Sequence, residues 1–357
     1  MNRRSPFCAL ALSLALSSCR SSEVQEAAPE PLVMFAAGSA SAAGEASSPG
    51  PASVPPARPT PLVLDLPGNG VPAISAWRPP SYPVPWVIRP EDHFYFARPI
   101  PSGEVNWPNA QYRYGYNYFV GESPHTGVDL GAEPGTPVLA AGPGEVVWTG
   151  YGLYWGYTRV DDPYGLAVAV RHDFGYAGLP LYTVYAHMSA IDVWPGQIVE
   201  TGEKLGGVGE TGHVTGPHLH FEVRLGENRF FATRNPELWM VPPEGWGVLA
   251  GRIMGTFGQP LPEMPVRVES LETGQRWDLT TYDRKTVVPD EIYQENFVLS
   301  DLPAGPYRVV VGFLWRWWSA DIFVHAGQTN LLTYQGRYGF AIEPSPTPAS
   351  DSAPPGP

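Results

Sequence analysis

Apolar and polar residues alternate with a period of two along much of this chain, which is the pattern of β-strands with one face toward a core. Near residue 219, for example, alternation places His218 and His220 together on one face of a strand. Leu219 and Phe221 then face the other way, toward apolar neighbours. Few segments have the longer period of an amphipathic helix, and the 42 prolines and 39 glycines favour turns. The pattern therefore predicts a mainly β protein with antiparallel sheets.

The net charge of the chain argues against some classes of binding partner. The 357 residues carry a formal net charge of −13. Nucleic-acid binding needs a basic surface, so we expect no nucleic-acid partner. The same acidity argues against adhesion to anionic lipid by charge, which leaves a lipid anchor as the expected membrane attachment.

The N-terminus predicts export. Arg3 and Arg4 precede an apolar run over 7–16 that is too short to span a bilayer as a permanent helix, so we expect a cleaved signal peptide over 1–19. Its end, Leu16-Ser17-Ser18-Cys19, resembles the lipobox of bacterial lipoproteins, in which the cysteine is lipidated. This resemblance implies that Cys19 carries a lipid anchor to the membrane. The alternative is an ordinary secretory signal with a chance cysteine.

Three further segments differ from the rest in composition. Residues 20–60 are rich in Ala, Pro, Ser and Gly and lack apolar periodicity, so we expect a disordered tether. We expect a disordered tail over 341–357 as well. The segment 61–116 is rich in Pro, Tyr and Trp, and we expect it to pack on the domain that follows, where it covers an apolar flank or builds one wall of a cleft.

Candidate chemistry is concentrated in five residues: His125, Asp129, His187, His218 and His220. A catalytic zinc takes three protein ligands from His nitrogen and carboxylate oxygen and leaves the fourth position to water. The metal lowers the pKa of that water from about 15.7 to about 7. A His-Asp-His set matches this requirement for one Zn2+ per chain, and the spare imidazoles can move protons or stabilise an oxyanion. The residue types indicate a metallohydrolase.

At these residues the chain resembles the lysostaphin-type (LytM-like) zinc endopeptidases, which cut peptide bonds in bacterial peptidoglycan. The motif H-x-x-x-D is present at 125–129 and H-x-H at 218–220, with an isolated His187 between them, and the match extends from about Tyr118 to Val223. The resemblance implies an antiparallel β-sheet peptidase domain over 117–242. It further implies an extracytoplasmic enzyme of the cell envelope that acts on peptidoglycan peptides. The implied zinc ligands are His125, Asp129 and His220, and the implied catalytic residues are His187 and His218.

Two long loops depart from the family pattern, at 154–163 and at 174–180, and we expect substrate specificity to depend on them. Many relatives also have a Gly-Asn pair where this chain has Gly165-Leu166. The other histidines have simpler interpretations. We expect a structural hydrogen bond from His172, a place near the cleft rim for His213, and packing or surface positions for His93 and His325.

A second β domain is expected after a proline-rich link at 240–245. Short strand-like runs separated by turns lie at 248–257, 266–271, 276–282, 296–299, 307–313 and 322–324. They resemble the carboxypeptidase regulatory-like β-sandwich, which predicts a small sandwich domain over 245–340. Within it, Trp315, Trp317 and Trp318 could stack on sugar rings, but we expect packing or an interdomain contact instead.

Two alternatives to a peptidoglycan endopeptidase stay open from the sequence. One is a non-catalytic wall-binding regulator of an amidase, although such regulators tend to lose the metal ligands that this chain retains. The other is a metalloprotease that acts on another envelope protein, because the motifs specify amide hydrolysis and not the substrate.

Overall fold

A computed structural model describes residues 79–103, 108–109, 112–116 and 124–341. The predicted signal peptide, lipidation site and tether lie outside the described residues, as does the tail beyond residue 341. The described residues contain 17 β-strands and three single-turn 3-10 helices, so the mainly β prediction is confirmed. No helix among them is long and apolar enough to cross a bilayer. All of them belong to one compact unit, residues 59–357.

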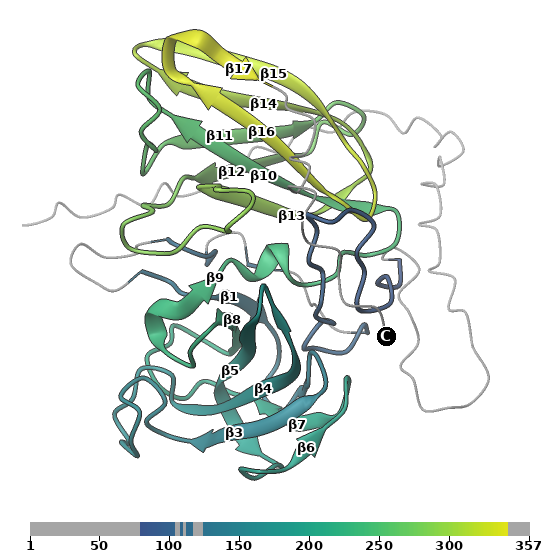
Figure 1. The fold of residues 1–357 in the computed structure, drawn as a ribbon, viewed down its shortest axis with the longest axis vertical. Helices are drawn as coiled ribbons and strands as arrows, with labels where there is room; N and C mark the ends of the chain where they lie inside the picture. Colours follow the sequence, from purple (N-terminus) through teal and green to yellow (C-terminus); the bar gives the residue numbers. More distant parts are fainter. Residues whose placement is uncertain (1–78, 104–107, 110–111, 117–123, 342–357) are drawn as a thin grey trace, which may run out of the picture. The chain divides into compact units, whose positions relative to one another are not determined.

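The first half of the described chain forms a nine-stranded sheet with the main path β1-β8-β5-β4-β3-β6 (Figure 1). β2 pairs with β7, β7 also pairs with β5, and β9 pairs with β8. All of these pairings are antiparallel. The strands are β1 (Val128–Gly131), β2 (Pro137–Leu139), β3 (Gly144–Gly150), β4 (Leu166–Tyr176), β5 (Leu179–Ile191), β6 (Ile198–Val199), β7 (Lys204–Val208), β8 (His218–Leu225) and β9 (Thr233–Arg234).

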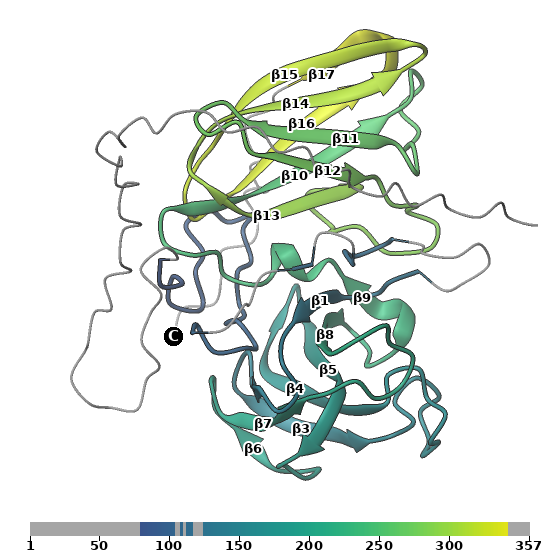
Figure 2. The same cartoon turned by 180° about the vertical axis from the view of Figure 1, so that it is seen from behind.

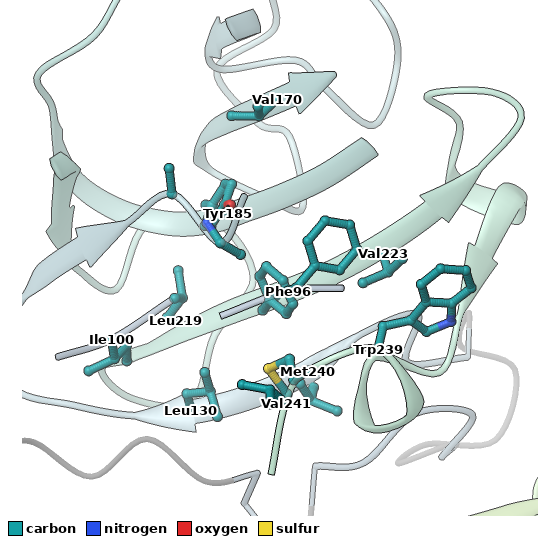
Figure 3. Close-up of a cluster of buried hydrophobic side chains, with 14 of the residues drawn as sticks. Phe96, Ile100, Leu130, Val170, Tyr185, Leu219, Val223, Trp239, Met240 and Val241 are labelled. Atoms are coloured by element: carbon teal, nitrogen blue, oxygen red, sulfur yellow. Dashed lines mark hydrogen bonds between the residues drawn. The ribbon is translucent and has the colours of Figure 1, made fainter. Parts of the chain in front are cut away.

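The predicted alternation on β8 determines which side chains enter the core. Leu219, Phe221 and Val223 are fully buried and belong to a cluster that contains Tyr185 and Trp239 (Figure 3). The opposite face of β8 carries His218 and His220. Because β8 lies between β1 and β5, this polar face is flanked on both sides by strands that can bring further side chains to it.

The second half forms two four-stranded sheets, β13-β10-β16-β17 and β12-β11-β14-β15 (Figure 2). Buried side chains of both sheets, such as Leu249, Leu299, Val268 and Val309, belong to one apolar cluster, which is the arrangement of a β-sandwich. The strands are β10 (Trp246–Met254), β11 (Pro265–Ser270), β12 (Arg276–Thr280), β13 (Phe297–Pro303), β14 (Gly305–Phe313), β15 (Arg316–Val324), β16 (Thr329–Gln335) and β17 (Gly339–Ala341).

Three of these strands differ clearly from the sequence prediction, and one of them, the short β17, was not predicted. β15 begins at Arg316, six residues before the predicted run at 322–324, and includes two of the three tryptophans. β16 was not predicted, because it is buried on both faces and so lacks alternation. Leu331 packs in the core shared with the first sheet, whereas Leu332 packs inside the sandwich.

The segment 79–103 packs against both halves of the described chain. Phe94, Phe96 and Ile100 are buried in the core of the first sheet. The backbone of Phe96 accepts a hydrogen bond from Val241 N (2.9 Å) and donates one to Trp239 O (3.0 Å). Arg98 forms an ion pair with Asp301 at the end of β13. The expected cover over an apolar flank is therefore present in residues 79–103.

Three 3-10 helices complete the described chain: η1 (Phe230–Ala232), η2 (Pro236–Leu238) and η3 (Gly336–Tyr338). Glu237 in η2 is fully buried, accepts a hydrogen bond from Ser300 N on β13 (2.8 Å) and forms an ion pair with Arg113. Val248, Val298 and Leu331 of the sandwich also belong to the apolar core that includes β8. The two sheet systems thus share buried contacts, both polar and apolar.

Candidate metal centre and active site

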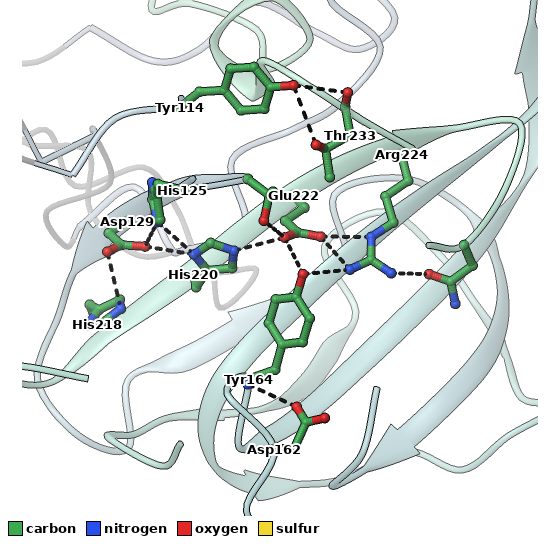
Figure 4. Close-up of polar contacts among 12 residues, drawn as sticks. Tyr114, His125, Asp129, Asp162, Tyr164, His218, His220, Glu222, Arg224 and Thr233 are labelled. Carbon is green, nitrogen blue, oxygen red and sulfur yellow. Dashed lines mark hydrogen bonds and ion pairs between the residues drawn. The ribbon is translucent and has the colours of Figure 1, made fainter. Parts of the chain in front are cut away.

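Three side chains from separate positions in the sequence converge beside β8. His125 Nε2 lies 2.9 Å from Asp129 Oδ1 and 3.0 Å from His220 Nδ1, and His220 Nδ1 lies 2.9 Å from Asp129 Oδ1 (Figure 4). One potential ligand atom from each residue therefore belongs to a single compact group that could hold a metal ion. The convergence follows from strand register, because Asp129 on β1 is the direct antiparallel partner of His220 on β8.

A glycine allows His125 to approach this pair. A Cβ at Gly127 would lie 2.3 Å from Phe221 O and 2.9 Å from the His220 ring, so no larger residue fits between β1 and β8. Gly127 is the middle of the H-x-x-x-D motif. The close approach keeps His125 and Asp129 on the same side of β1 as His220.

The two imidazoles of this group are oriented by acceptors on their other nitrogens. His125 Nδ1 donates to Arg113 O (3.1 Å), and His220 Nε2 donates to Glu222 Oε1 (3.1 Å). Metal-ligating histidines ordinarily have such a second acceptor, which selects the tautomer and ring orientation.

The donor set fits zinc. Tetrahedral zinc with ligand distances of about 2.0–2.1 Å separates its ligand atoms by about 3.3 Å, so the three atoms need to move apart only by a few tenths of an ångström. Two imidazole nitrogens and one carboxylate oxygen are also the ligand types of catalytic zinc sites. His125, Asp129 and His220 are therefore suited to the ion that the sequence predicts.

Charges within the group are strongly coupled. Burial acts to raise the pKa of Asp129, but the adjacent His125 and His220 hold it well below its ordinary value. Burial acts to lower the pKa of His220, but its hydrogen bonds to Asp129 and Glu222 raise it to about 9. The carboxylate is therefore ionised, and a positive charge is stabilised between Asp129 and Glu222.

Glu222 belongs to the site although the sequence did not predict it as a site residue. Its side chain is fully buried and accepts hydrogen bonds from Tyr164 Oη (2.6 Å), Arg224 Nε (2.7 Å), His220 and Thr126. Burial acts to raise the pKa of Glu222, but Arg224 and His220 lower it to about 2. The available signal was the strand period, since Glu222 and Arg224 follow His218 and His220 on the same face of β8.

His187 and His218 lie next to the three-residue group. Their ring centroids are 4.8 Å apart, and the His187 centroid is 5.6 Å from that of His220. His218 Nε2 lies 3.3 Å from Asp129 Oδ2. Both rings donate from Nδ1 to a backbone carbonyl, of Thr211 and Gly216 respectively, at 2.8 Å. Their Nε2 atoms are therefore the nitrogens available for proton transfer.

Both of these imidazoles are held neutral. Burial, assisted by the neighbouring His220 and His218, lowers the pKa of His187 to about 3. Burial also lowers the pKa of His218, although Asp129 acts in the opposite direction. A neutral imidazole can accept a proton at neutral pH, as a general base must.

His187 reaches the site through an irregular backbone. Its φ of 63° is in the left-handed region, which is uncommon for a residue with a side chain. The pairing of β4 with β5 shifts register between Leu166/Met188 and Val168/Tyr185, which is a β-bulge at His187. Bulges redirect side chains next to active sites. This bulge sets the direction of His187, which strand alternation alone does not specify.

The five residues open into one cleft of about 880 Å³. The loop predicted to affect specificity contributes Tyr154, Trp155 and Pro163 to its wall, and Trp155 is 44% exposed. His213 also lines the cleft, in agreement with its expected place near the rim. Tyr112 and Thr215 line the cleft as well, and their hydroxyl oxygens lie 3.2 Å apart.

The second loop has a different role. In the β4–β5 hairpin, Phe174 packs on Phe96 and Tyr176 packs edge-on against Trp239, and neither lines the cleft. The expectation that residues 174–180 determine specificity is therefore wrong. Their aromatic side chains are needed to bury the segment 79–103 against the sheet.

The remaining histidines have structural contacts. His172 lies between Pro143 O and Thr183 Oγ1, both at 2.9 Å, as expected for a structural hydrogen-bonder. His93 is fully buried and lies 3.0 Å from Asp290 Oδ2 through its Nε2. His325 is exposed.

Comparison with known proteins agrees with the site. Residues 123–231 match the model of peptidase family M23, and this segment contains all five predicted site residues. This part of the chain is therefore similar to the M23 peptidases.

Among curated relatives, the DD-carboxypeptidase/endopeptidase Mpg of Neisseria meningitidis serogroup B is 42% identical over 101 residues, which are 28% of this chain and 20% of the relative. The peptidoglycan DD-endopeptidase ShyA of Vibrio cholerae serotype O1 is 40% identical over 102 residues, with the same two shares. The chain thus spans about a fifth of the length of these relatives. Among solved structures, the catalytic domain of lysostaphin from Staphylococcus simulans is 27% identical, with a TM-score of 0.30, and the match covers 36% of this chain and 96% of that one.

Proposed function

We propose that the protein is a zinc-dependent endopeptidase that hydrolyses peptide bonds in the cross-bridges or stem peptides of peptidoglycan. The observation that carries the proposal is the convergence of His125, Asp129 and His220 at one point of a cleft with two neutral histidines beside it. When bound, zinc supplies the Lewis acidity that activates water and a carbonyl group toward hydrolysis. The match to peptidase family M23 supports both the metal and the reaction.

His187 and His218 have complementary roles in this proposal. Both rings line the cleft from β5 and β8, and hydrogen bonds to Thr211 O and Gly216 O hold them in place. His218 Nε2 lies 3.3 Å from Asp129 Oδ2. A neutral imidazole accepts the proton of the attacking water and, once protonated, donates to the oxyanion or to the leaving amine. The two rings are close enough to act on adjacent atoms of one scissile peptide bond.

Peptidoglycan is proposed as the substrate because the curated relatives that match this chain include a peptidoglycan DD-endopeptidase and a DD-carboxypeptidase/endopeptidase. The aromatic wall at Tyr154 and Trp155 gives the cleft an apolar side beside the polar metal centre. A peptide with aliphatic side chains suits the apolar side of such a cleft.

The proposed location is the bacterial cell envelope, outside the cytoplasm. Its support is the signal-like segment 1–19 with a lipobox-like end at Cys19, together with the acidic, turn-rich composition. In this proposal a lipid at Cys19 attaches the enzyme to the membrane and the segment 20–60 spans the distance to the wall.

The proposal is tested with the chain from residue 20 onward, which keeps every described residue and lacks the predicted signal and lipidation site. Zinc content is measured by mass spectrometry of the metal, and cleavage by mass spectrometry of peptidoglycan fragments after incubation. His220→Ala should abolish zinc retention and cleavage together. His187→Ala should retain zinc and lose cleavage by a factor of at least about 100.

The matched control is His325→Ala, which removes an exposed imidazole far along the sequence from the cleft. It should keep both zinc and activity. Zinc retention by His220→Ala, or full activity of His187→Ala, would contradict the assigned roles. Tightly bound zinc with no cleavage of any peptidoglycan fragment would contradict the substrate and favour another envelope protein.

A further inference from the structure

Large apolar side chains are exposed together in three loops at one end of the β-sandwich. We define this sandwich tip as Phe257, Leu314, Trp315, Trp317 and Tyr338, which are between 65% and 103% exposed. Phe257 follows β10, and Leu314 and Trp315 form the turn between β14 and β15. Trp317 is the second residue of β15, and Tyr338 lies in η3. β15 and β17 lie side by side at this end in both views (Figures 1 and 2).

Two of the loops contact each other directly, and the strand that follows the third packs beside them. Arg337 N donates to Thr256 Oγ1 (3.4 Å), and Gln335 Nε2 donates to Thr256 O (3.4 Å). The ring of Trp318 packs on Gly339, where a Cβ would lie 3.1 Å from it. These contacts join the β10 loop to the loop that contains η3 and place the start of β15, next to the β14–β15 turn, beside β17.

The turn at the apex has an unusual sequence for its conformation. Phe313 pairs with Arg316, so Leu314 and Trp315 form a two-residue turn, and their φ values are 46° and 64°. Such turns strongly favour Asn-Gly, because bulky residues are strained in the left-handed region. The backbone thus keeps two large apolar side chains in an unfavourable conformation at the most exposed point, and strain of this kind occurs preferentially at functional sites.

The charge of the sandwich tip is opposite to that of the whole chain. Its loops, residues 254–259, 313–317 and 335–339, contain Arg316 and Arg337 and no acidic residue, although the chain has a net charge of −13. Both arginines are exposed. Apolar side chains flanked by arginines complement an anionic surface with an apolar interior.

We propose that the sandwich tip docks on an anionic lipid surface, with Leu314 and Trp315 inserted between headgroups and Arg316 and Arg337 beside the phosphates. Trp and Tyr favour the membrane–water interface, which suits the other members of the tip. Stacking on sugar is the less favoured occupant, because the apex residue Leu314 has no ring and Trp315 projects fully into solvent. The proposal is independent of the peptidase activity.

The test is co-sedimentation of the chain from residue 20 onward with vesicles of phosphatidylcholine alone and of equal parts phosphatidylglycerol and phosphatidylcholine. The wild type should bind the mixed vesicles. Leu314→Asn/Trp315→Gly should bind them at least about tenfold more weakly, because the inserted apolar area is lost. This variant should fold well, since it places the preferred residues in the turn.

Charge is tested separately with Arg316→Glu/Arg337→Glu, which should lose the preference for phosphatidylglycerol, by about fivefold for each charge removed. Trp194→Ser is the matched control, because Trp194 is 65% exposed in the β5–β6 turn of the other sheet. It should bind vesicles as the wild type does. Cleavage of soluble peptidoglycan fragments should be unchanged in all these variants, so a failure of this proposal is distinguishable from a failure of the proposed activity.

Three results would overturn the proposal. The first is no binding of the wild type to mixed vesicles, and the second is an equal loss of binding in Trp194→Ser. The third is binding to peptide-free glycan strands that depends on Leu314 and Trp315 while vesicle binding does not, which would assign the tip to sugar stacking.

Discussion

Glu222→Gln is the substitution that tests most directly how the metal centre is built. Glu222 Oε1 accepts from His220 Nε2 at 3.1 Å, while Oε2 accepts from Arg224 Nε at 2.7 Å. Glutamine has nearly the same shape but removes the negative charge from a site with no solvent exposure. The change therefore affects two properties, the stability of the fold and the affinity for zinc.

The stability loss follows from the burial of the partner. Arg224 is also fully buried, and without Glu222 its guanidinium retains only the neutral acceptors Tyr164 Oη and Asn228 Oδ1, both at 2.8 Å. Removal of one partner from a buried ion pair costs about 3–5 kcal/mol. We expect a decrease in the free energy of unfolding in this range, which is a large share of the about 5–15 kcal/mol of a typical domain.

The loss of zinc affinity follows from the hydrogen bond to His220. A carboxylate that accepts from a ligating histidine orients the ring and increases its basicity, and its loss typically weakens metal binding by about 10–100-fold. We expect the dissociation constant for zinc to rise by this factor, or by about 1.4–2.7 kcal/mol.

Both properties are measured on the same preparations. Urea unfolding of the zinc-free chain gives the stability, and competition with a chelator of known affinity gives the zinc dissociation constant. Glu227→Gln is the control, since Glu227 is exposed and its pair with Arg229 lies at the surface. We expect this control to change stability by less than about 1 kcal/mol and leave zinc affinity unchanged.

A double variant separates the ion pair from the hydrogen bond. Glu222→Gln/Arg224→Met removes the unpaired buried charge, so it should be less destabilised than the sum of the two single variants, while its zinc affinity stays low. The reasoning is refuted if Glu222→Gln unfolds at the same urea concentration as the wild type and binds zinc within twofold of it.

Three further predictions concern other parts of the fold. Gly127→Ala should weaken zinc binding at least about tenfold, because its Cβ would meet Phe221 O at 2.3 Å and separate β1 from β8. Gly131→Ala is the control, because a Cβ there has no neighbour within 4 Å, and it should leave zinc binding unchanged. Equal zinc affinities of the two variants would contradict this account. Burial lowers the pKa of His172 to about 4, against about 6.5 when unfolded. As the pH falls from about 6.5 to 4, the free energy of unfolding of the wild type should therefore decrease by on the order of 3 kcal/mol more than that of His172→Gln. Urea unfolding at several pH values measures this difference, and parallel pH profiles of the two proteins would contradict the prediction. Removal of zinc with a chelator should lower the midpoint temperature of thermal unfolding. Zinc at about 100 times its dissociation constant should restore about 2.7 kcal/mol of stability. An unchanged midpoint in calorimetry would show that the folded chain does not bind zinc.

The predictable part of the site depends on short-range periodicity. Alternation on β8 is sufficient to place His218 and His220 on one face. The M23 motif then links these residues to His125 and Asp129 across nearly a hundred positions. The same alternation extends to Glu222 and Arg224, two and four residues beyond His220.

The direction of His187 could not be predicted. It depends on a bulge in the β4–β5 pairing and on a left-handed φ of 63°, and neither has a signature in the isolated segment YTVYAHMSAI. The role of the loop at 174–180 could not be predicted from its sequence either. Its aromatic residues are typical of a cleft loop, but the position of the segment 79–103 makes them part of the core.

The three tryptophans at 315–318 also show what periodicity does not predict. The sequence places Trp315 and Trp317 on one face and Trp318 on the opposite one, and Trp318 does pack against Tyr334. The expectation of buried contacts was wrong for Trp315 and Trp317, which are exposed. Periodicity assigns a residue to a face of a strand because side chains alternate with the backbone. What covers that face depends on strands and loops from distant parts of the chain, so the bulge, the buried Glu222–Arg224 pair and the exposed sandwich tip were determined only by the tertiary structure.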